Sequence, residues 1–323
     1  MTGTNLEELL QRRTSLFQKK WWLEQPTVQN QEWLYLLEEE TRNSIMIEWY
    51  FSDKKTLTEV ISWKKNTSEH ADKITWYFDA ASLIYEFAYQ KHIDNISLEI
   101  QSYDIKTIHS LMFKLIDPAI WGKRRSWNMI ITGAKIQPLF GCFIEEGIKY
   151  LIRYIQLQKN NLTLVQLLAR FHVLFEAIHP FEDGNGRVWR ILINYILVSQ
   201  WYPNIIIKGT DRAKKQYFDA LESWEKWLYT IFPDNIPTND RDKQWDFLKM
   251  EKIIYHELFQ TLDIMILAND RDLKPLTQIC IDYGYSDEYA RKLVKRGQVI
   301  AKKIWNTRYS SLDYFQKPLT QKN

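Results

Sequence analysis

The sequence predicts a mainly α-helical protein, and three observations support this fold class. Glycine (10) and proline (9) together make up only 19 of the 323 residues, so an architecture built on many tight turns is not expected. Apolar side chains recur at intervals of three and four residues in several segments, as in amphipathic helices. Hydrophobic residues make up 45% of the chain and charged residues 26%, so the helices have enough apolar surface to form a core.

The length is sufficient for two or three domains, and we expect four segments along the chain. Residues 1–90 are predicted to form an N-terminal helical region, and residues 91–232 the central core. A polar, turn-rich run predicts a linker at residues 233–245. Residues 246–323 are then a separate C-terminal domain.

Local patterns distinguish the elements of the core. The helical spacing is clearest over residues 76–90 and 163–178. Residues 126–137 differ, because β-branched residues surround Gly133 and the stretch ends before Pro138. This pattern predicts a short β-hairpin in a helical protein.

Charge and cysteine content limit the class of protein. Residues 287–323 contain nine Lys and Arg and three acidic residues, a net charge of +6, while the preceding 286 residues carry −3. The first residues lack the apolar core of a signal peptide, and no apolar run approaches the length of a membrane span. The two cysteines, Cys142 and Cys280, lack the CxxC spacing of a zinc cluster. We therefore expect a cytoplasmic protein with no membrane contact.

One segment is the most informative about chemistry. It reads His179-Pro180-Phe181-Glu182-Asp183-Gly184-Asn185-Gly186-Arg187-Val188-Trp189-Arg190. Pro180 ends the preceding amphipathic helix near His179, and Val188 begins the apolar stripe of the next helix. The segment is therefore predicted to be a loop that leads into a helix N-terminus.

This loop has the composition of a phosphate-binding site. Gly184 and Gly186 let the backbone approach a ligand closely, and the start of a helix offers unpaired N–H groups with partial positive charge. Arg187 and Arg190 add fixed charge and forked donors that suit phosphate oxygens. Asp183 offers a hard oxygen ligand for Mg²⁺.

His179 completes the predicted chemistry, because an imidazole can take a proton from a hydroxyl beside a bound phosphate. Together these residue types predict transfer of a group from a nucleotide. Taken singly, a glycine pair at a helix start is usually a cap, and two arginines three residues apart are usually a solvated face.

A metal site is an alternative for the same helix. His172, Glu176 and His179 repeat at intervals of four and three, and Glu176-x-x-His179 looks like half of a di-iron site. The chain contains no second Glu-x-x-His, and Pro180 breaks the helix at this point. We therefore expect His172 to be a buried, hydrogen-bonded histidine.

The loop resembles the signature HxFx[D/E]GNGRxxR of the Fic family. Eight of twelve positions match: His179, Phe181, Asp183, Gly184, Asn185, Gly186, Arg187 and Arg190. The resemblance extends upstream to His109, His172 and Ile178, and downstream to Tyr217, Ala220 and Leu221. Roughly residues 44–232 resemble one Fic unit.

The resemblance implies a Fic-type helical core with a short β-hairpin flap near residues 126–137. In that flap, Ile130, Ile131 and Thr132 would position the substrate. The implied reaction is transfer of AMP from ATP to the hydroxyl of a protein Ser, Thr or Tyr, with His179 as the base.

The resemblance also implies a role for each remaining motif residue. Asp183 would hold Mg²⁺ or Mn²⁺, and Phe181 would pack inward to fix the loop. Asn185 and the amides of Gly184 and Gly186 would cradle the phosphates, and Arg187 and Arg190 would bind the β- and γ-phosphates. Gly186 favours AMP transfer, because family members that transfer the γ-phosphoryl group have a lysine there.

A second family motif, the inhibitory [S/T]xxxE[G/N], is similar to residues 44–49. Ser44 and Glu48 match it, whereas Trp49 departs from it. The resemblance implies that Glu48 pairs with Arg190 and restrains the enzyme. The alternative is that Glu48 is an exposed acid on a helix.

The basic C-terminal residues predict a small domain of their own. Residues 275–316 read as a helix, a turn, a second helix capped by Ser286, and a hairpin. This order resembles a winged helix-turn-helix of the excisionase-like kind. The DNA-binding candidates are Arg291, Lys292, Lys295 and Arg296. The alternative is a protein-docking module with a solvated basic face.

The sequence leaves three functions open. The first is a protein adenylyltransferase, restrained by Glu48, that modifies a target protein or itself. The second is a DNA-binding regulator that uses the loop as a nucleotide sensor. The third is a hydrolase that removes AMP, with Glu48 orienting water. The intact His179 and Asp183 favour an enzyme.

Overall fold

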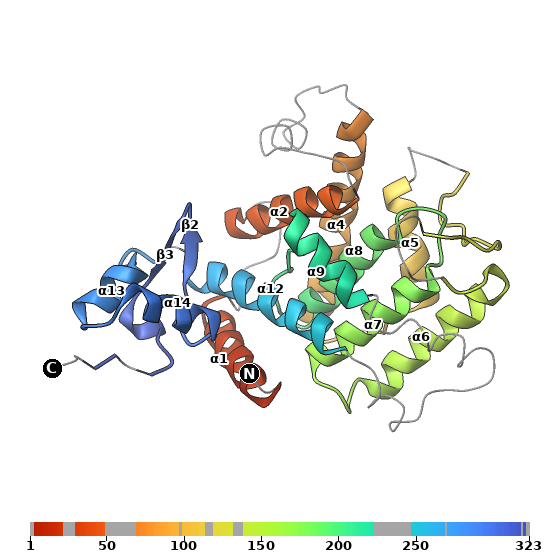
Figure 1. Ribbon diagram of the computed structural model, residues 1–323. Helices are drawn as coiled ribbons and strands as arrows, with labels where there is room; N and C mark the ends of the chain where they lie inside the picture. Colours follow the sequence, from red (N-terminus) through yellow and green to blue (C-terminus); the bar gives the residue numbers. More distant parts are fainter. Residues whose placement is uncertain are drawn as a thin grey trace. The chain divides into compact units, whose positions relative to one another are not determined.

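The computed structural model describes residues 3–21, 30–48, 69–96, 99–113, 119–131, 138–221, 247–268, 270–317 and 319–320 (Figure 1). The predicted fold class is confirmed, because the described residues are mainly helical. The helices are α1 (Gly3–Trp21), α2 (Gln31–Ile47), α4 (Glu69–Ile93), α5 (Ser102–Phe113), α6 (Ile144–Gln158), α7 (Leu164–Ile178), α8 (Asn185–Ser199), α9 (Asp211–Leu221), α12 (Leu248–Ile266), α13 (Leu276–Asp282) and α14 (Asp287–Lys295). The strands are β1 (Lys274–Pro275), β2 (Lys302–Ile304) and β3 (Thr307–Ser310).

The chain divides into two compact units. Residues 26–254 form the larger unit, and residues 1–25 together with residues 255–323 form the smaller one. The predicted boundaries differ at the N-terminus, because they place residues 1–25 with the candidate inhibitory segment rather than with the C-terminal residues. The predicted linker at residues 233–245 lies outside the described residues.

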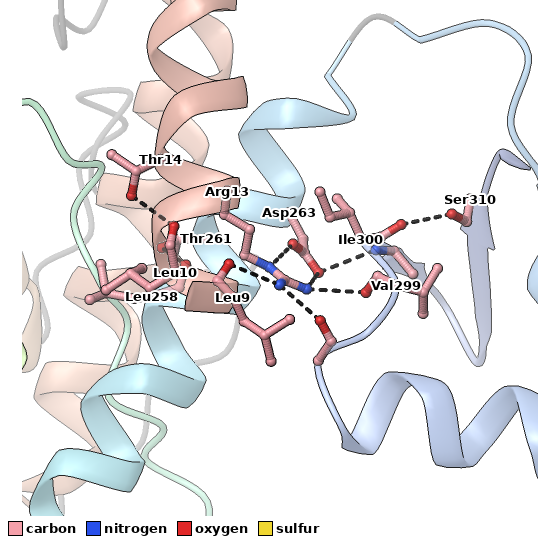
Figure 2. Close-up of polar contacts among 12 residues, drawn as sticks. Leu9, Leu10, Arg13, Thr14, Leu258, Thr261, Asp263, Val299, Ile300 and Ser310 are labelled. Atoms are coloured by element: carbon pink, nitrogen blue, oxygen red, sulfur yellow. Dashed lines mark hydrogen bonds and ion pairs between the residues drawn. The ribbon is translucent and has the colours of Figure 1, made fainter. Parts of the chain in front are cut away.

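Arg13 explains why the N-terminal helix belongs to the smaller unit (Figure 2). Its guanidinium is buried and donates to the carboxylate of Asp263 on α12 at 2.7 Å. It also donates to the carbonyl oxygens of Leu9, Gly297 and Val299, at 3.4, 2.9 and 3.1 Å. A buried guanidinium is costly unless it is paired, so these partners from both ends of the sequence hold α1 in the smaller unit.

The helix, turn, helix and hairpin predicted for the C-terminal residues are present. Ser286 caps α14, since its side chain accepts a hydrogen bond from the amide of Tyr289. The strands β2 and β3 form an antiparallel hairpin, and β1 pairs with the other edge of β3 in the order β1-β3-β2. The winged helix-turn-helix identity of this module stays a prediction.

The larger unit is built around α8. Every residue of α8 except Gly186 is buried, and α2, α4, α5 and α7 all contact it. A helix that is buried on all sides is mostly apolar, which accounts for the run from Ile191 to Val198, where the one amide side chain, Asn194, donates to the carbonyl oxygen of Ile205 at 3.1 Å. The N-terminus of α8 is therefore held in a rigid setting.

The loop predicted before α8 is confirmed. α7 begins with a capping box between Thr163 and Gln166, and it ends at His179, whose φ of 48° and ψ of 63° are left-handed. α8 begins after Gly184, which has a φ of 80°. Two left-handed residues thus bracket a short turn between two buried helices.

The predicted β-hairpin is only partly described. Residues 126–131 contain no strand, and residues 132–137, including Thr132, lie outside the described residues. Ile130 is 83% exposed, and Ile131 is half-buried. Among the helices given above, none is long and apolar enough to cross a bilayer.

Candidate active site

Asn185 holds the loop between α7 and α8 from within. Its Oδ1 accepts a hydrogen bond from the amide of Phe181 at 2.9 Å, and its Nδ2 donates to the carbonyl oxygen of Phe181 at 2.8 Å. Phe181 is fully buried beneath the loop. The side chain of Asn185 therefore closes the turn, and its predicted contact with phosphates stays a prediction.

Three stacked rings support the loop. The ring of His109 lies 3.9 Å from that of Phe181 and 4.5 Å from that of Phe113, both nearly parallel to it. Gly184 lies against the same stack, since a Cβ atom there would come within 2.5 Å of Phe113. With a positive φ as well, only glycine fits this position.

His109 joins α5 to the loop as a neutral side chain. Its Nδ1 accepts from the amide of Gly122 at 3.0 Å, so its Nε2 is left to donate to the carbonyl oxygen of Asp183 at 3.2 Å. Burial lowers the pKa of His109 to about 4. His109 therefore supports the loop and does not act as an acid or base near neutral pH.

Asp183 is the loop residue that is predicted to hold a metal ion, and its side chain is open to solvent. Its Oδ1 accepts from the amide of Gly184 at 2.6 Å, and its Oδ2 accepts from Arg187 at 2.8 Å. Burial raises the pKa of Asp183, but the charge of Arg187 and these hydrogen bonds outweigh it, so the net pKa is lowered. The side chain is 53% exposed. A carboxylate has about four acceptor sites, so two remain for a cation.

The two motif arginines are both buried. Arg187 donates to Asp183 and lies over the ring of Phe113, with 5.0 Å between its guanidinium carbon and the ring centre. Arg190 is buried deeper, and its side chain is 3% exposed. Neither guanidinium therefore belongs to a solvated helix face.

The guanidinium of Arg190 is held by α2. Its Nε donates to Oγ of Ser44 at 2.6 Å, and its Nη2 donates to the Ser44 carbonyl oxygen at 3.2 Å and to Oε1 of Glu48 at 2.7 Å. Burial lowers the pKa of Arg190, but Glu48 together with Tyr217 and Tyr77 outweighs burial, and the net pKa is raised. The contact that the inhibitory motif implied is thus present, while Trp49 lies outside the described residues.

Gly186 is required by this ion pair. A Cβ atom at Gly186 would lie 2.7 Å from Oε1 of Glu48 and 3.0 Å from Nη1 of Arg190. Any side chain at this position would therefore compete for the space in which Glu48 meets Arg190.

Arg125 fixes the backbone of His179. Its Nε donates to the His179 carbonyl oxygen at 2.7 Å, and its Nη2 donates to that of Ile178 at 3.0 Å. The same guanidinium donates to the carbonyl oxygens of Trp127 and Leu139, at 2.7 and 2.5 Å. One buried arginine therefore holds the end of α7, the start of the segment predicted to be the flap, and Leu139, which lies two residues after that segment.

Sequence reasoning missed Arg125. It follows Lys123 and Arg124 in a basic run that reads as a solvated surface. Burial lowers the pKa of Arg125, yet its partners are carbonyl oxygens at the C-terminus of α7, where a positive charge is favoured. Because carbonyl partners leave no charge pattern in the sequence, no local signal identified this residue.

The di-iron alternative is not supported by the described residues. The ring of His172 lies between Trp189, at 4.3 Å, and Tyr217, at 5.3 Å. It is buried as predicted, but the predicted hydrogen bond is not found in the described part of the chain, where neither nitrogen has a partner. No group of three metal-ligating side chains occurs among the described residues.

The predicted DNA-binding residues lie in the smaller unit, at the end of α14. All four, namely Arg291, Lys292, Lys295 and Arg296, are exposed. Two of them already have acidic partners one helical turn away, because Arg291 pairs with Asp287, and Lys292 pairs with Glu288 at 2.8 Å.

Comparisons with known proteins identify the loop and its setting. Residues 99–197 match the model of the Fic/DOC family. A probable protein adenylyltransferase of Aquifex aeolicus is 28% identical over 195 residues, which is 56% of this chain and 58% of that protein. The protein adenylyltransferase Fic of Drosophila virilis is 31% identical over 126 residues, which is 38% of this chain and 25% of that protein. The chain therefore matches less than two thirds of the length of either relative.

A solved structure shares the fold more widely. A Fic domain containing signaling protein from Bacteroides thetaiotaomicron aligns with a TM-score of 0.61 and 21% identity, over 82% of this chain and 96% of that one. Residues 99–197, which include His179, Asp183 and both motif arginines, therefore match the Fic/DOC family in sequence, and the fold is that of a solved Fic protein.

Proposed function

We propose that this chain is a protein adenylyltransferase, which transfers AMP from ATP to a protein hydroxyl and is restrained by Glu48. One observation carries the proposal: the loop has His179 at one end and the N-terminus of α8, with two buried arginines, at the other. The names of the Aquifex and Drosophila relatives support the same reaction class.

The N-terminus of α8 suits the phosphates of ATP. Its N-cap, Gly184, has no side chain to cap the first turn, so in the described residues the amides that follow Gly184 remain available to a ligand, while the Gly184 amide itself donates to Asp183. The buried charge of Arg187 lies in the same turn. Asp183 is exposed and its pKa is lowered, so its carboxylate would hold a Mg²⁺ or Mn²⁺ ion, which would supply charge neutralisation at the phosphates.

His179 would act on the target hydroxyl, which belongs to a Ser, Thr or Tyr of another protein or of this chain. The hydroxyl proton passes to the imidazole while the oxygen attacks the α-phosphorus. The new P–O bond forms as the bond to the bridging oxygen breaks, and its electron pair leaves with pyrophosphate. Gly186, which stands where phosphoryl-transferring members have lysine, favours this orientation of the nucleotide.

The proposed restraint follows from the contacts of Arg190. The γ-phosphate that this arginine would bind must first displace Glu48. A charge-assisted hydrogen bond contributes about 1.5–3 kcal/mol, so the pair would lower the population of the productive state by about ten- to a hundredfold. A nucleotide bound without Arg190 would also be misaligned for attack.

Labelling tests the reaction directly. The Glu48→Gly chain is incubated with Mg²⁺ and ATP labelled with ³²P in either the α- or the γ-phosphate. We expect label from the α-phosphate to enter protein and label from the γ-phosphate to remain in solution. Transfer of the γ-label alone would identify phosphoryl transfer instead and contradict the proposal.

A further inference from the structure

Glu176 is a largely buried carboxylate that the proposed reaction leaves unused. It lies in the last turn of α7, three residues before His179, and its side chain is 11% exposed. Its Oε2 lies 3.5 Å from Nδ1 of His179, whose side chain is 14% exposed. Among the described residues, Glu176 forms an ion pair with His179 alone.

Nδ1 of His179 and Oε1, the second carboxylate oxygen of Glu176, both lack a hydrogen-bond partner among the described residues, and both atoms are buried. Burying a carboxylate without an Arg or Lys partner costs free energy, and an apolar residue would pack at lower cost. A carboxylate at this position therefore points to a role beyond packing.

The backbone of His179 makes the contact specific. The residue is held in a left-handed conformation at the end of α7, and Arg125 fixes its carbonyl oxygen. Rotation of the ring is then the main freedom left to the side chain. With Nδ1 turned to Glu176 inside the protein, Nε2 is the nitrogen left to face a reacting group.

We propose that Glu176 is a positioning residue that holds His179 in the tautomer with the proton on Nδ1. A carboxylate that accepts a hydrogen bond from Nδ1–H keeps the proton on Nδ1. The lone pair of Nε2 is then free, as a general base requires. Once Nε2 has taken a proton, the same carboxylate stabilises the imidazolium that results. The 3.5 Å separation shortens as substrate binds, as catalytic hydrogen bonds do.

The catalytic part of this inference rests on the proposed function. In that step the proton of the target hydroxyl moves to Nε2, the hydroxyl oxygen forms a bond to the α-phosphorus, and pyrophosphate leaves with the electron pair of the broken bond. The proton on Nδ1 remains between His179 and Glu176 throughout. The proton on Nε2 passes to solvent before the next cycle.

A tautomer measurement tests the inference without any activity. The full chain is labelled with ¹⁵N-histidine, and the signal of His179 among the six histidines is assigned by its loss in His179→Ala. We expect the neutral ring of the wild type to carry its proton on Nδ1. Glu176→Met, which keeps volume but removes the acceptor, should shift the proton toward Nε2. The exposed neighbour Glu182 provides a matched control, since Glu182→Met should leave the tautomer unchanged.

The same tautomer in the wild type and in Glu176→Met would overturn the inference. So would an Nε2-protonated ring in the wild type. Thermal melts of both variants show that any change arises in a folded chain.

Kinetics test the catalytic part in the Glu48→Gly background. Glu176→Gln should lower kcat for α-label transfer by about tenfold or more, with KM for ATP unchanged. The loss should not exceed the roughly 10²–10⁴-fold that general-base catalysis contributes. Glu176→Asp should recover part of the loss. An unchanged kcat, or a rise in KM alone, would contradict a positioning role. If Glu48→Gly itself transfers no AMP, the proposed function fails, while the tautomer result still decides the role of Glu176.

Discussion

The loop before α8 and the basic C-terminal residues both look like anion-binding regions in the sequence, yet their charges are arranged differently. After the loop, in the first turns of α8, Arg187 and Arg190 are buried, and each is paired with a carboxylate, Asp183 or Glu48. On α14, Arg291 and Lys292 are exposed, and their acidic partners lie one turn away on the same helix.

This difference indicates which charges can support a specific function. A buried guanidinium costs free energy unless its partners are fixed, so its presence restricts the geometry of everything around it. An exposed pair at i and i+4 contributes little and restricts almost nothing. Changes at buried charges should therefore have large, specific effects, and changes at the exposed charges small ones.

The largest effect is expected from His179→Ala. This change removes the proposed base but leaves the N-terminus of α8 and both arginines in place. Transfer of the α-label should fall by about 10²–10⁴-fold, because that is the contribution of general acid–base catalysis. ATP binding, measured by calorimetry, should survive, and full transfer activity in the variant would rule out His179 as the base.

Arg125→Met should give the next largest effect. It leaves the carbonyl oxygens of Ile178, His179 and Leu139 without their buried donor. The free energy of unfolding should fall by about 3 kcal/mol or more in urea titrations. Lys123→Met, an exposed lysine in the same basic run, is the matched control. Equal free energies of unfolding for the two variants would show that the hydrogen bonds of Arg125 do not stabilise the fold.

Glu40 extends the comparison to a buried carboxyl group on α2. Burial raises its pKa to about 7 from the ordinary 4.5, although Tyr85, Tyr77 and Asn204 donate hydrogen bonds that favour the charged form. A raised folded-state pKa means that the stabilising contribution is complete below about pH 4.5 and is lost as pH rises through about 7.

The wild type should therefore lose about 3 kcal/mol of stability across that range relative to Glu40→Gln, which cannot ionise. Unfolding in urea at a series of pH values measures the difference. Parallel pH profiles for the two proteins would show that the fold does not raise this pKa.

The smallest effect is expected from Arg291→Gln on the exposed face of α14. The unfolding midpoint should move by less than about 2 °C, because an exposed i, i+4 pair contributes little. A shift as large as that of Arg125→Met would contradict the distinction between the two regions.

DNA binding by the smaller unit is a separate prediction. Duplex DNA is titrated with the full chain at low and at moderate salt. If Lys295 and Arg296 contact phosphates, affinity should fall steeply with salt, because each contact releases counterions. Absence of binding at low salt would favour the alternative that this module docks a protein.

Much of the larger unit follows from its sequence. The spacing of apolar residues predicts α7 and α8, and Pro180 with Gly184 predicts the loop between them. The contact of Glu48 with Arg190 was accessible only through the resemblance to the Fic family, because 142 residues separate the pair.

Other features could not be predicted, for physical reasons. Arg125 and Arg13 donate largely to backbone carbonyl oxygens, and every residue has one, so no pattern marks such partners. Arg13 holds α1 to the C-terminal residues, and so do Trp21 and Lys20, which also donate to backbone carbonyl oxygens. His109 is similar, since its two hydrogen bonds join it to the amide of Gly122 and the carbonyl oxygen of Asp183.

The central claim is that Glu48 restrains AMP transfer by occupying Arg190. The most direct test is the initial rate of α-label transfer by the wild type, by Ser44→Ala and by Glu48→Gly under identical conditions. We predict that Glu48→Gly is faster than the wild type by about ten- to a hundredfold, since a charge-assisted bond to Arg190 is lost, and that Ser44→Ala gains less. Equal rates for the wild type and Glu48→Gly, with ATP bound by both, would contradict the claim.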